Sequence, residues 1–313
     1  MNQSAGNGAS VVLSNSTNET SDITIGIDVS KFQGTIDWAQ VASSGVDFAM
    51  IRVGYRAQKT GVIYADTNAK YNMQQAAANG IKVGAYFFSS AVNEAEAIEE
   101  ADWVADFISD YSITYPVAFD CEGFNTSESR QKSMTKAERT AVATAFLQEV
   151  YDKGYTPMFY AASSELTNNS QWNTASLENS YKIWVAQYPS TPYPETPSTS
   201  YTGTCSMWQY TNQGRVAGIG TNVDINVAYF GYSGSNGSLS GETAAAASPD
   251  VEAGMVFTSV NDTVTAKDEV RLRDKPSQDT DAAVITTLVN GETVTRTGTS
   301  SSGWSRLVYL SLI

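Results

Sequence analysis

Two acidic side chains stand close together at the end of an apolar stretch, in the segment VAFDCEGF of residues 117–124. The apolar run before Asp120 and Glu122 predicts a buried strand, and side chains two residues apart on a strand point to the same side. Burying charge beside such a run costs free energy unless other groups compensate for it. A pair of carboxyl groups placed in this way is suited to general acid–base chemistry.

Two further aspartates lie at the ends of apolar runs. Asp28 follows the run in GIDVS, and Asp224 lies in NVDIN near the last predicted strand. If the strands close into a barrel, the first and last strands are neighbours, and the C-terminal strand ends form the mouth. We therefore expect all four acids to surround one mouth with an aromatic rim. The rim residues expected are Tyr86, Tyr160, Trp184, Tyr188, Trp208 and Tyr210.

This set of groups suits the hydrolysis of a glycosidic bond. The reaction needs one protonated carboxyl group and a negative charge near an oxocarbenium-like transition state. Crowded carboxylates raise the pKa of one member, which then keeps its proton near neutrality. Other interpretations stay open: the acids are simply solvated, they bind calcium, or Asp28 caps a short helix. Arg52, in MIRVGY, is expected to be an ion-pair partner of these acids rather than a catalyst.

The composition narrows the chemistry further. The chain has 313 residues, 42% of them hydrophobic, and a formal net charge of −14, which disfavours a nucleic-acid partner. It has no histidine, so catalysis by Ser-His-Asp or Cys-His groups is excluded. Cys121 and Cys205 permit one disulfide without requiring it. No apolar run is long enough to span a membrane, and we expect no metal or cofactor.

Residues 23–230 alternate between apolar runs and helical patterns, which predicts parallel βαβ units and a closed α/β barrel. Helices are expected at 66–79, at 94–110 and from Thr135 to Lys153, with glycine stops at Gly80 and Gly154. The last third has few helical patterns, so the helical ring should be incomplete. Strands are expected at residues 23–30, 48–55, 82–89, 116–122, 157–162, 182–188, 205–211 and 223–230.

The ends of the chain differ from this central part. Residues 1–22 predict a flexible polar leader, without the basic and apolar regions of a signal peptide. The barrel is expected over 23–232, and the small, polar residues of 233–256 predict a linker. Residues 257–313 contain short alternating strands with turn signals, which predicts a small all-β module.

Several segments together resemble the lysozymes of glycoside hydrolase family 25, the Chalaropsis-type N-acetylmuramidases. The segments are GIDVSKFQGTIDW, FAMIRVGYR, VGAYFFS, PVAFDCEG, KIWVAQY and MWQYT followed by VDIN. The resemblance covers residues 23–230 and implies an irregular, TIM-like β/α barrel. It also implies cleavage of the β-1,4 bond between N-acetylmuramic acid and N-acetylglucosamine in peptidoglycan, with net retention and without a cofactor.

The resemblance also implies roles for individual residues. Glu122 would be the general acid/base, and Asp120 would be the nucleophile or would orient the substrate's acetamido group. Asp28 and Asp224 would support the site and bind sugar. Substrate-binding positions are expected at Tyr86, Tyr160, Gln187, Tyr188, Trp208 and Arg52.

The C-terminal part resembles a bacterial SH3-type (SH3b) cell-wall module through VRLRDKPS and GETVTRTGTSSSGWSRLVY. It departs from that pattern at LVYLSLI, so an incomplete module stays open. We expect a monomer that acts on peptidoglycan outside the cell or at the wall. Two alternatives are a catalytically inactive wall-binding protein and a chitinase-like glycosidase, because DCE also matches the end of the chitinase acid motif.

Overall fold

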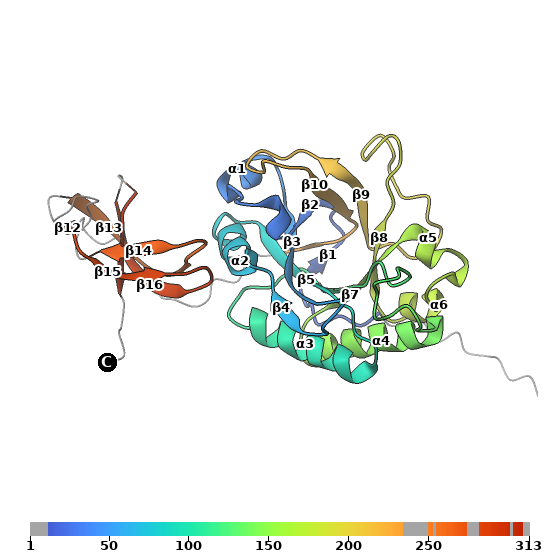
Figure 1. Cartoon of the computed structure of the whole chain (residues 1–313). Coiled ribbons are helices and arrows are strands. Elements are labelled where there is room, and N and C mark those ends of the chain that lie inside the picture. The colour runs from blue at the N-terminus through green and yellow to red at the C-terminus, as the bar shows by residue number, and fades with distance from the viewer. Residues whose placement is uncertain (1–11, 234–249, 253–254, 274–281, 301–302, 309–313) are drawn as a thin grey trace, which may run out of the picture.

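The fold is given by a computed structural model that describes residues 12–233, 250–252, 255–273, 282–300 and 303–308. Its central feature is a nine-stranded sheet, eight of whose strands close into a barrel (Figure 1). The barrel strands are β2 (Thr24–Val29), β3 (Phe48–Arg56), β5 (Lys82–Phe88), β6 (Val117–Asp120), β7 (Pro157–Ala162), β8 (Lys182–Ala186), β9 (Met207–Gly214) and β10 (Val223–Ala228).

Strand direction decides which ends meet at the mouth. From β2 through β9, each barrel strand runs parallel to the next, as the alternating pattern predicted. The last strand, β10, is antiparallel to both of its neighbours, β9 and β2, and its pairing with β2 closes the barrel. The start of β10 therefore lies at the same end of the barrel as the C-terminal ends of the other strands.

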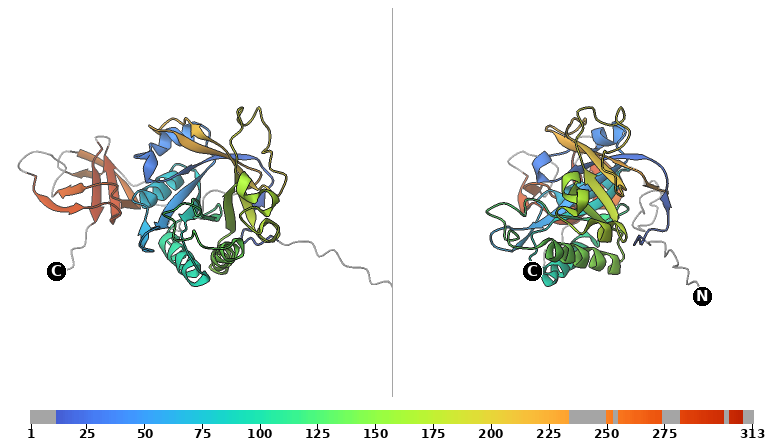
Figure 2. Two further views of the ribbon diagram at one scale, coloured as in Figure 1. Left: turned by 45° about the vertical axis from the view of Figure 1, so that its right-hand side comes forward. Right: turned by 90° about the vertical axis from the view of Figure 1, so that its right-hand side faces the viewer.

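The helical ring is incomplete, as expected. The helices are α1 (Trp38–Ser43), α2 (Ala69–Ala78), α3 (Glu94–Ile108), α4 (Lys136–Asp152), α5 (Ser163–Leu166) and α6 (Thr174–Glu178). The long helices α3 and α4 pack together along one side of the barrel (Figure 2). The α4 helix begins with the predicted capping box, in which Glu138 accepts from the Thr135 N–H at 2.7 Å. No helix lies between β8 and β9 or between β9 and β10.

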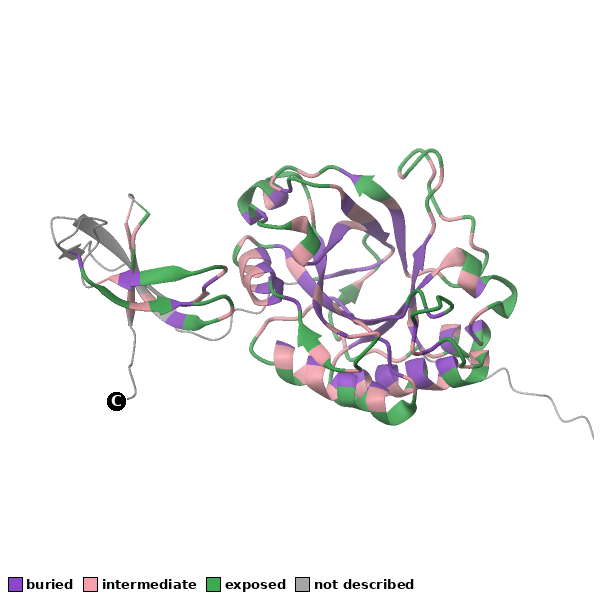
Figure 3. Cartoon of the chain, in the orientation of Figure 1, coloured by how far each residue is buried: buried purple, intermediate pink, exposed green. Residues whose placement is uncertain are grey.

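Alternating side chains divide the core into two layers. On β6, Val117 and Phe119 point outward into a large cluster shared with the helices, which includes Phe146 of α4. Ala118 points inward to a second cluster inside the barrel, with Met50 and other residues. The barrel strands are buried on both faces, whereas the helices expose one side to solvent (Figure 3). Apolar burial on this scale is the main favourable contribution to folding.

Part of the expected leader is bound to the barrel rather than free. Strand β1 (Glu19–Thr20) pairs with β11 (Gly231–Tyr232), and the Asn15 amide donates to the backbone oxygen of Tyr151 at 2.7 Å. Residues assigned to the leader are therefore packed against residues assigned to the barrel. Residues 1–11 of the expected leader, and most of the expected linker, lie outside the described residues.

The described residues from 250 onward contain strands, in agreement with the expected all-β composition. One antiparallel sheet contains β12 (Asp250–Glu252), β13 (Met255–Thr265), β16 (Thr293–Ser300) and β17 (Ser305–Val308). A second pairs β14 (Val270–Arg273) with β15 (Val284–Leu288). A small cluster of Ala266, Leu272, Leu288 and Val294 packs between them. Its likeness to an SH3-type module stays a prediction.

Candidate active site

A pocket of about 270 Å³ opens at the C-terminal ends of the parallel strands, and all four acids identified in the sequence line it. Polar and aromatic side chains at the barrel mouth form its walls. This end of an α/β barrel is where barrel enzymes place their sites. The other lining residues are Ser30, Phe32, Gln33, Arg52, Tyr86, Phe88, Tyr160, Trp184, Tyr188, Gln209 and Asn212.

The closing strand pair brings two of the acids together. Asp28 near the end of β2 and Asp224 near the start of β10 are direct partners in the β2–β10 register. Because β2 and β10 are antiparallel, the end of β2 and the start of β10 lie at the same end of the barrel, and so do Asp28 and Asp224. Asp28 does not cap the short 3₁₀ helix Lys31–Gln33, whose N-cap is Ser30, so the helix-capping interpretation is wrong.

The other two acids lie where β6 ends. Asp120 is the last residue of β6, and its backbone oxygen accepts from the Ser89 N–H at 2.7 Å. Cys121 points away into the core, as expected, and Gly123 turns the chain with a φ of 66°. Glu122 is therefore exposed beyond the strand end, at the mouth, and it lines the same pocket as Asp120. Among the described residues, Asp120 Oδ1 has no hydrogen-bond partner.

Burial and mutual repulsion keep protons on this cluster. Burial raises the pKa of Asp28 well above its usual value, and the nearby charge of Asp224 raises it further. Burial, followed by the charge of Glu122, does the same to the pKa of Asp120. The pKa of Asp224 rises to about 6, chiefly through burial, and burial also raises that of Glu122. Unequal burial and mutual repulsion thus separate the pKa values of these carboxyl groups, which is the condition for one of them to keep a proton while another is ionised.

Two side-chain amides hold Asp28. Gln209 Nε2 and Asn226 Nδ2 both donate to Asp28 Oδ2, at 2.8 and 2.9 Å. The indole N–H of Trp184 donates to Asn226 Oδ1 at 2.8 Å, which requires the Asn226 amide nitrogen to face Asp28. The hydroxyl groups of Tyr160 and Tyr188 donate to Gln209 Oε1 at 3.1 and 2.6 Å and orient the second amide in the same way.

Aromatic rings form the walls of the pocket. Trp184 contacts Tyr160 and Tyr86 edge-on, with ring centroids 4.8 and 6.2 Å apart. Burial raises the pKa of Tyr86 well above its usual value, and the charge of Asp28 adds to this, so its hydroxyl stays protonated. Tyr188 lies at the rim and is half exposed. These walls offer flat apolar surface around the carboxyl groups.

Two predicted substrate-binding residues, Trp208 and Gln187, lie outside the pocket. Trp208 is fully buried in a separate cluster and donates from its indole to the Gln187 backbone oxygen at 2.7 Å. The Gln187 side chain accepts from Thr199 Oγ1 at 3.0 Å, so it supports the following loop. Neither lines the pocket. Arg52 does line it, but its ion-pair partner is Asp66 at 2.7 Å rather than any of the four acids.

Sequence reasoning missed Gln209, Asn226 and Phe32, and strand alternation restricts the possible directions of only the first two. Gln209 follows Trp208 on β9, so one of the two must point inward and the other outward. Asn226 lies two residues after Asp224 on β10, in the quoted segment VDIN. Phe32 lies in GIDVSKFQG, and only the path of the chain after β2 shows that it reaches the pocket.

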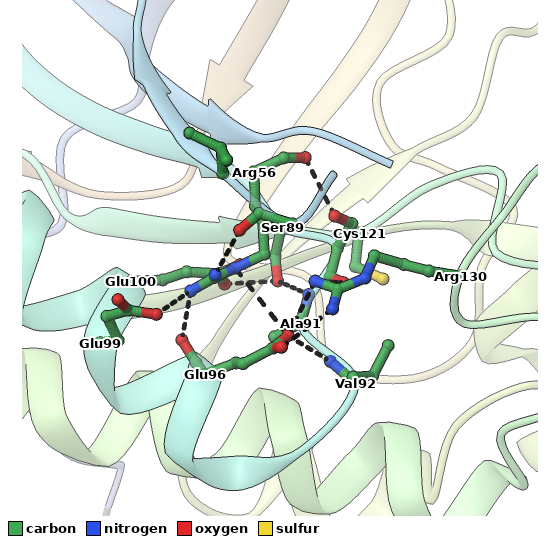
Figure 4. Close-up of polar contacts among 12 residues, drawn as sticks. Arg56, Ser89, Ala91, Val92, Glu96, Glu99, Glu100, Cys121 and Arg130 are labelled. Atoms are coloured by element: carbon green, nitrogen blue, oxygen red, sulfur yellow. Dashed lines mark hydrogen bonds and ion pairs between the residues drawn. The ribbon is translucent and has the colours of Figure 1, made fainter. Parts of the chain in front are cut away.

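A buried polar network supports the peptide that carries the two β6 acids (Figure 4). Glu100 of α3, fully buried, accepts from Arg56 Nε at 2.7 Å and from Ser89 Oγ at 2.6 Å. Ser89 in turn holds the backbone of Asp120, as described above. Gln131 donates to the Ala91 backbone oxygen at 2.9 Å and contacts Cys121 Sγ. The network therefore links α3, the end of β5 and the segment that carries Glu122.

The cysteines and acids of the described residues form neither a disulfide nor a group of metal ligands. Cys121 and Cys205 are both free, so the permitted disulfide is not formed. In the part of the chain that the structure describes, no group of three or more histidine, cysteine or acidic residues could hold a metal ion. None of the described helices is long and apolar enough to cross a membrane.

Comparisons with known proteins agree with this architecture. Lysozyme M1 of Streptomyces globisporus is 30% identical over 213 residues, which are 64% of this chain and 66% of the relative. The crystal structure of a lysozyme from Streptomyces coelicolor has a TM-score of 0.51 at 25% identity, covering 68% of this chain and 93% of the other. The structure of the autolysin LytC of Streptococcus pneumoniae, solved with a synthetic peptidoglycan ligand, has a TM-score of 0.53 at 24% identity. The match covers 66% of this chain and 47% of LytC.

The chain thus spans about two thirds of Lysozyme M1 and about half of LytC. The sequence model of one family, described as Glycosyl hydrolases family 25, matches residues 27–219. The match includes Asp28, Asp120 and Glu122, and it ends just before Asp224. On this match the chain belongs to family 25 of the glycosyl hydrolases.

Proposed function

We propose that the chain is a lysozyme that cleaves the β-1,4 bond between N-acetylmuramic acid and N-acetylglucosamine in peptidoglycan. The observation that carries the proposal is the meeting of four carboxyl groups in one aromatic-walled pocket at the barrel mouth. Membership of family 25 and the lysozymes among its relatives support the same substrate. Such an enzyme would act outside the cell or at the cell wall.

The positions of the two β6 acids support different roles for them. Glu122 is exposed at the mouth, where it would reach the leaving-group oxygen and act as general acid and then as general base. Asp120 is buried below it, with one oxygen unpartnered among the described residues. It would act on the anomeric carbon directly or orient the substrate's acetamido group.

Asp120 and Glu122 stand two residues apart at one strand end and line one pocket, which supports net retention of configuration. A retaining glycosidase holds its two carboxyl groups about 5–5.5 Å apart, whereas an inverting one separates them by roughly 6.5–9.5 Å so that a water molecule fits between them. Asp28 and Asp224 would stabilise positive charge on the sugar and bind its hydroxyl groups.

The test is lysis of purified sacculi by the wild type and by Glu122→Gln. We expect the wild type to clear the suspension and Glu122→Gln to lose activity by about 100-fold or more, because the amide cannot transfer the proton. Glu128→Gln is the matched control, because Glu128 is an exposed acid further along the same loop that does not line the pocket. Equal lysis by Glu122→Gln and the wild type would overturn the role of Glu122.

A further inference from the structure

An exposed aromatic surface continues from the pocket onto the hairpin formed by β3 and β4 (Ile63–Ala65). The end of β3 pairs with β4, and Tyr55 lies directly opposite Tyr64, with ring centroids 5.6 Å apart. Phe32 lies between this pair and the pocket, which it lines. At 69% exposure it is the most exposed large hydrophobic side chain of residues 12–233. We call Lys31, Phe32, Tyr55 and Tyr64 the hairpin strip.

Cations connect the rings of the hairpin strip. Lys31 Nζ lies 5.7 Å from the ring of Phe32 and 5.6 Å from that of Tyr55. The Arg52 guanidinium lies 5.0 and 5.7 Å from the same two rings. The strip is therefore one continuous surface of aromatic faces and positive charge that begins at the rim of the pocket.

The two cations differ in how their charge is compensated. Arg52 is paired with Asp66 at 2.7 Å, and this pair is largely buried. Lys31 forms no ion pair with any residue that the structure describes. Lys31 is therefore a cation without an ion-pair partner among the described residues, next to the pocket-lining Phe32, in a chain of net charge −14. Contacts between a cation and exposed rings add little to the stability of a fold, so stability alone does not account for the arrangement.

We propose that the hairpin strip binds the acidic peptide stem of a peptidoglycan strand whose sugar chain occupies the pocket. This inference rests on the proposed function. A stem carboxylate would pair with Lys31, and the small apolar side chains of the stem would pack on Phe32, Tyr55 and Tyr64. In a strand that carries stems the sugars are neutral, because the lactyl carboxyl group of each N-acetylmuramic acid forms the amide bond to the stem. The carboxylates that could pair with Lys31 therefore lie on the peptide. The strip thereby favours glycan that carries peptides over bare glycan.

The experiment compares two substrates, soluble glycan strands that carry peptide stems and the same strands after an amidase has removed the stems. The second substrate keeps one lactyl carboxylate on each N-acetylmuramic acid but has no peptide carboxylates. For Lys31→Gln we expect KM to rise about three- to tenfold on the peptide-bearing strands, with kcat almost unchanged. Lys31→Glu should raise KM on these strands further, whereas Lys31→Arg should keep KM close to the wild-type value. The matched control is Lys70→Gln, because Lys70 lies 5.6 Å from the Phe107 ring in the same kind of contact, outside the pocket and the strip.

The outcomes separate this inference from the proposed function. A rise in KM limited to peptide-bearing strands, and reduced by added salt, supports stem binding. An equal rise on both substrates would show that the strip binds sugar and would overturn the inference, as would no change on either. In both of these cases the wild type still cleaves glycan, so the proposed function stands. If the wild type cleaves neither substrate, the proposed function itself fails.

Discussion

When Asp28 is protonated, the proton lies on one particular oxygen of its carboxyl group. Both amide donors point at Oδ2, and the groups behind them fix the orientation of each amide. A proton on Oδ2 would point at the amide N–H groups of Gln209 and Asn226, which are themselves donors to that oxygen. A protonated Asp28 therefore carries its proton on Oδ1. Gln209 and Asn226 therefore position the carboxyl group and decide which of its oxygens can donate a hydrogen bond.

Gln209→Met tests this positioning role. The variant keeps the size of the side chain but removes the donor to Asp28 and the acceptor for the hydroxyl groups of Tyr160 and Tyr188. We expect kcat to fall about 10- to 100-fold, since hydrogen bonds to charged groups contribute roughly 1.5–3 kcal/mol. Gln213→Met, at an exposed position of the same strand, is the control. If both variants kept wild-type kcat and the same pH profile, Gln209 would not position Asp28.

Asp224→Asn should stabilise the fold at neutral pH. The folded-state pKa of Asp224 is raised to about 6 from an ordinary 3.8, so the folded protein holds a proton that the unfolded chain has released. Stability from this group is present below about pH 4 and is lost as pH rises through 6. We expect the variant to gain about 1–2 kcal/mol at pH 7 and little at pH 4.

Thermal unfolding at the two pH values measures the effect. A gain of equal size at pH 4 and pH 7 would show that the proton equilibrium of Asp224 is not its source. Asp224→Asn should also lose activity, because catalysis needs the negative charge of Asp224, whereas folding does not.

The residue scale also shows how far sequence reasoning reaches. That the acids lie at strand ends could be read from the apolar runs that precede or follow them. The choice between Trp208 and Gln209 could not, because both faces of β9 are apolar enough to be buried. The partner of Arg52 could not be predicted either, since Asp66 lies in the chain after β4 and only the folded hairpin brings it near.

At the scale of elements, local signals predicted the helices well and the strand ends less well. The capping box at Thr135 and the glycines after α2 and α4 act within a few residues, so they can be read from sequence. The end of β6 at Asp120 depends on the neighbouring strands, and the sequence had extended it to Glu122. The reversed direction of β10 has no local signal at all, although it decides where Asp224 lies.

The connection between α3 and the barrel gives a prediction about stability. Arg56 is buried and is bound by Glu100, also buried, and by Glu99, whose side chain is 65% exposed. Glu100→Ala should cost about 3 kcal/mol, because it leaves the Arg56 charge and Ser89 without a buried partner. Glu99→Ala removes a pair of similar length at the surface and should cost less than about 1 kcal/mol. Equal losses in chemical denaturation would contradict this assignment.

At the scale of the whole molecule, the barrel forms its own core, and the described residues from 250 onward form a separate small one. If the latter is a wall-binding module, it raises the local concentration of the enzyme on its substrate. We expect a chain that ends at Ser233 to bind sacculi about tenfold or more weakly than the full chain. The turnover of small soluble glycans should stay within about twofold. Equal binding of sacculi by both chains would contradict a wall-binding role.

The central claim is that the pocket cuts one particular sugar linkage. The digested sacculi are reduced with borohydride, and mass spectrometry of the fragments then identifies the sugar at each new reducing end. We predict fragments that end in reduced N-acetylmuramic acid for the wild type and none for Glu122→Gln. Fragments that end in reduced N-acetylglucosamine, or digestion by Glu122→Gln at the wild-type rate, would contradict the account.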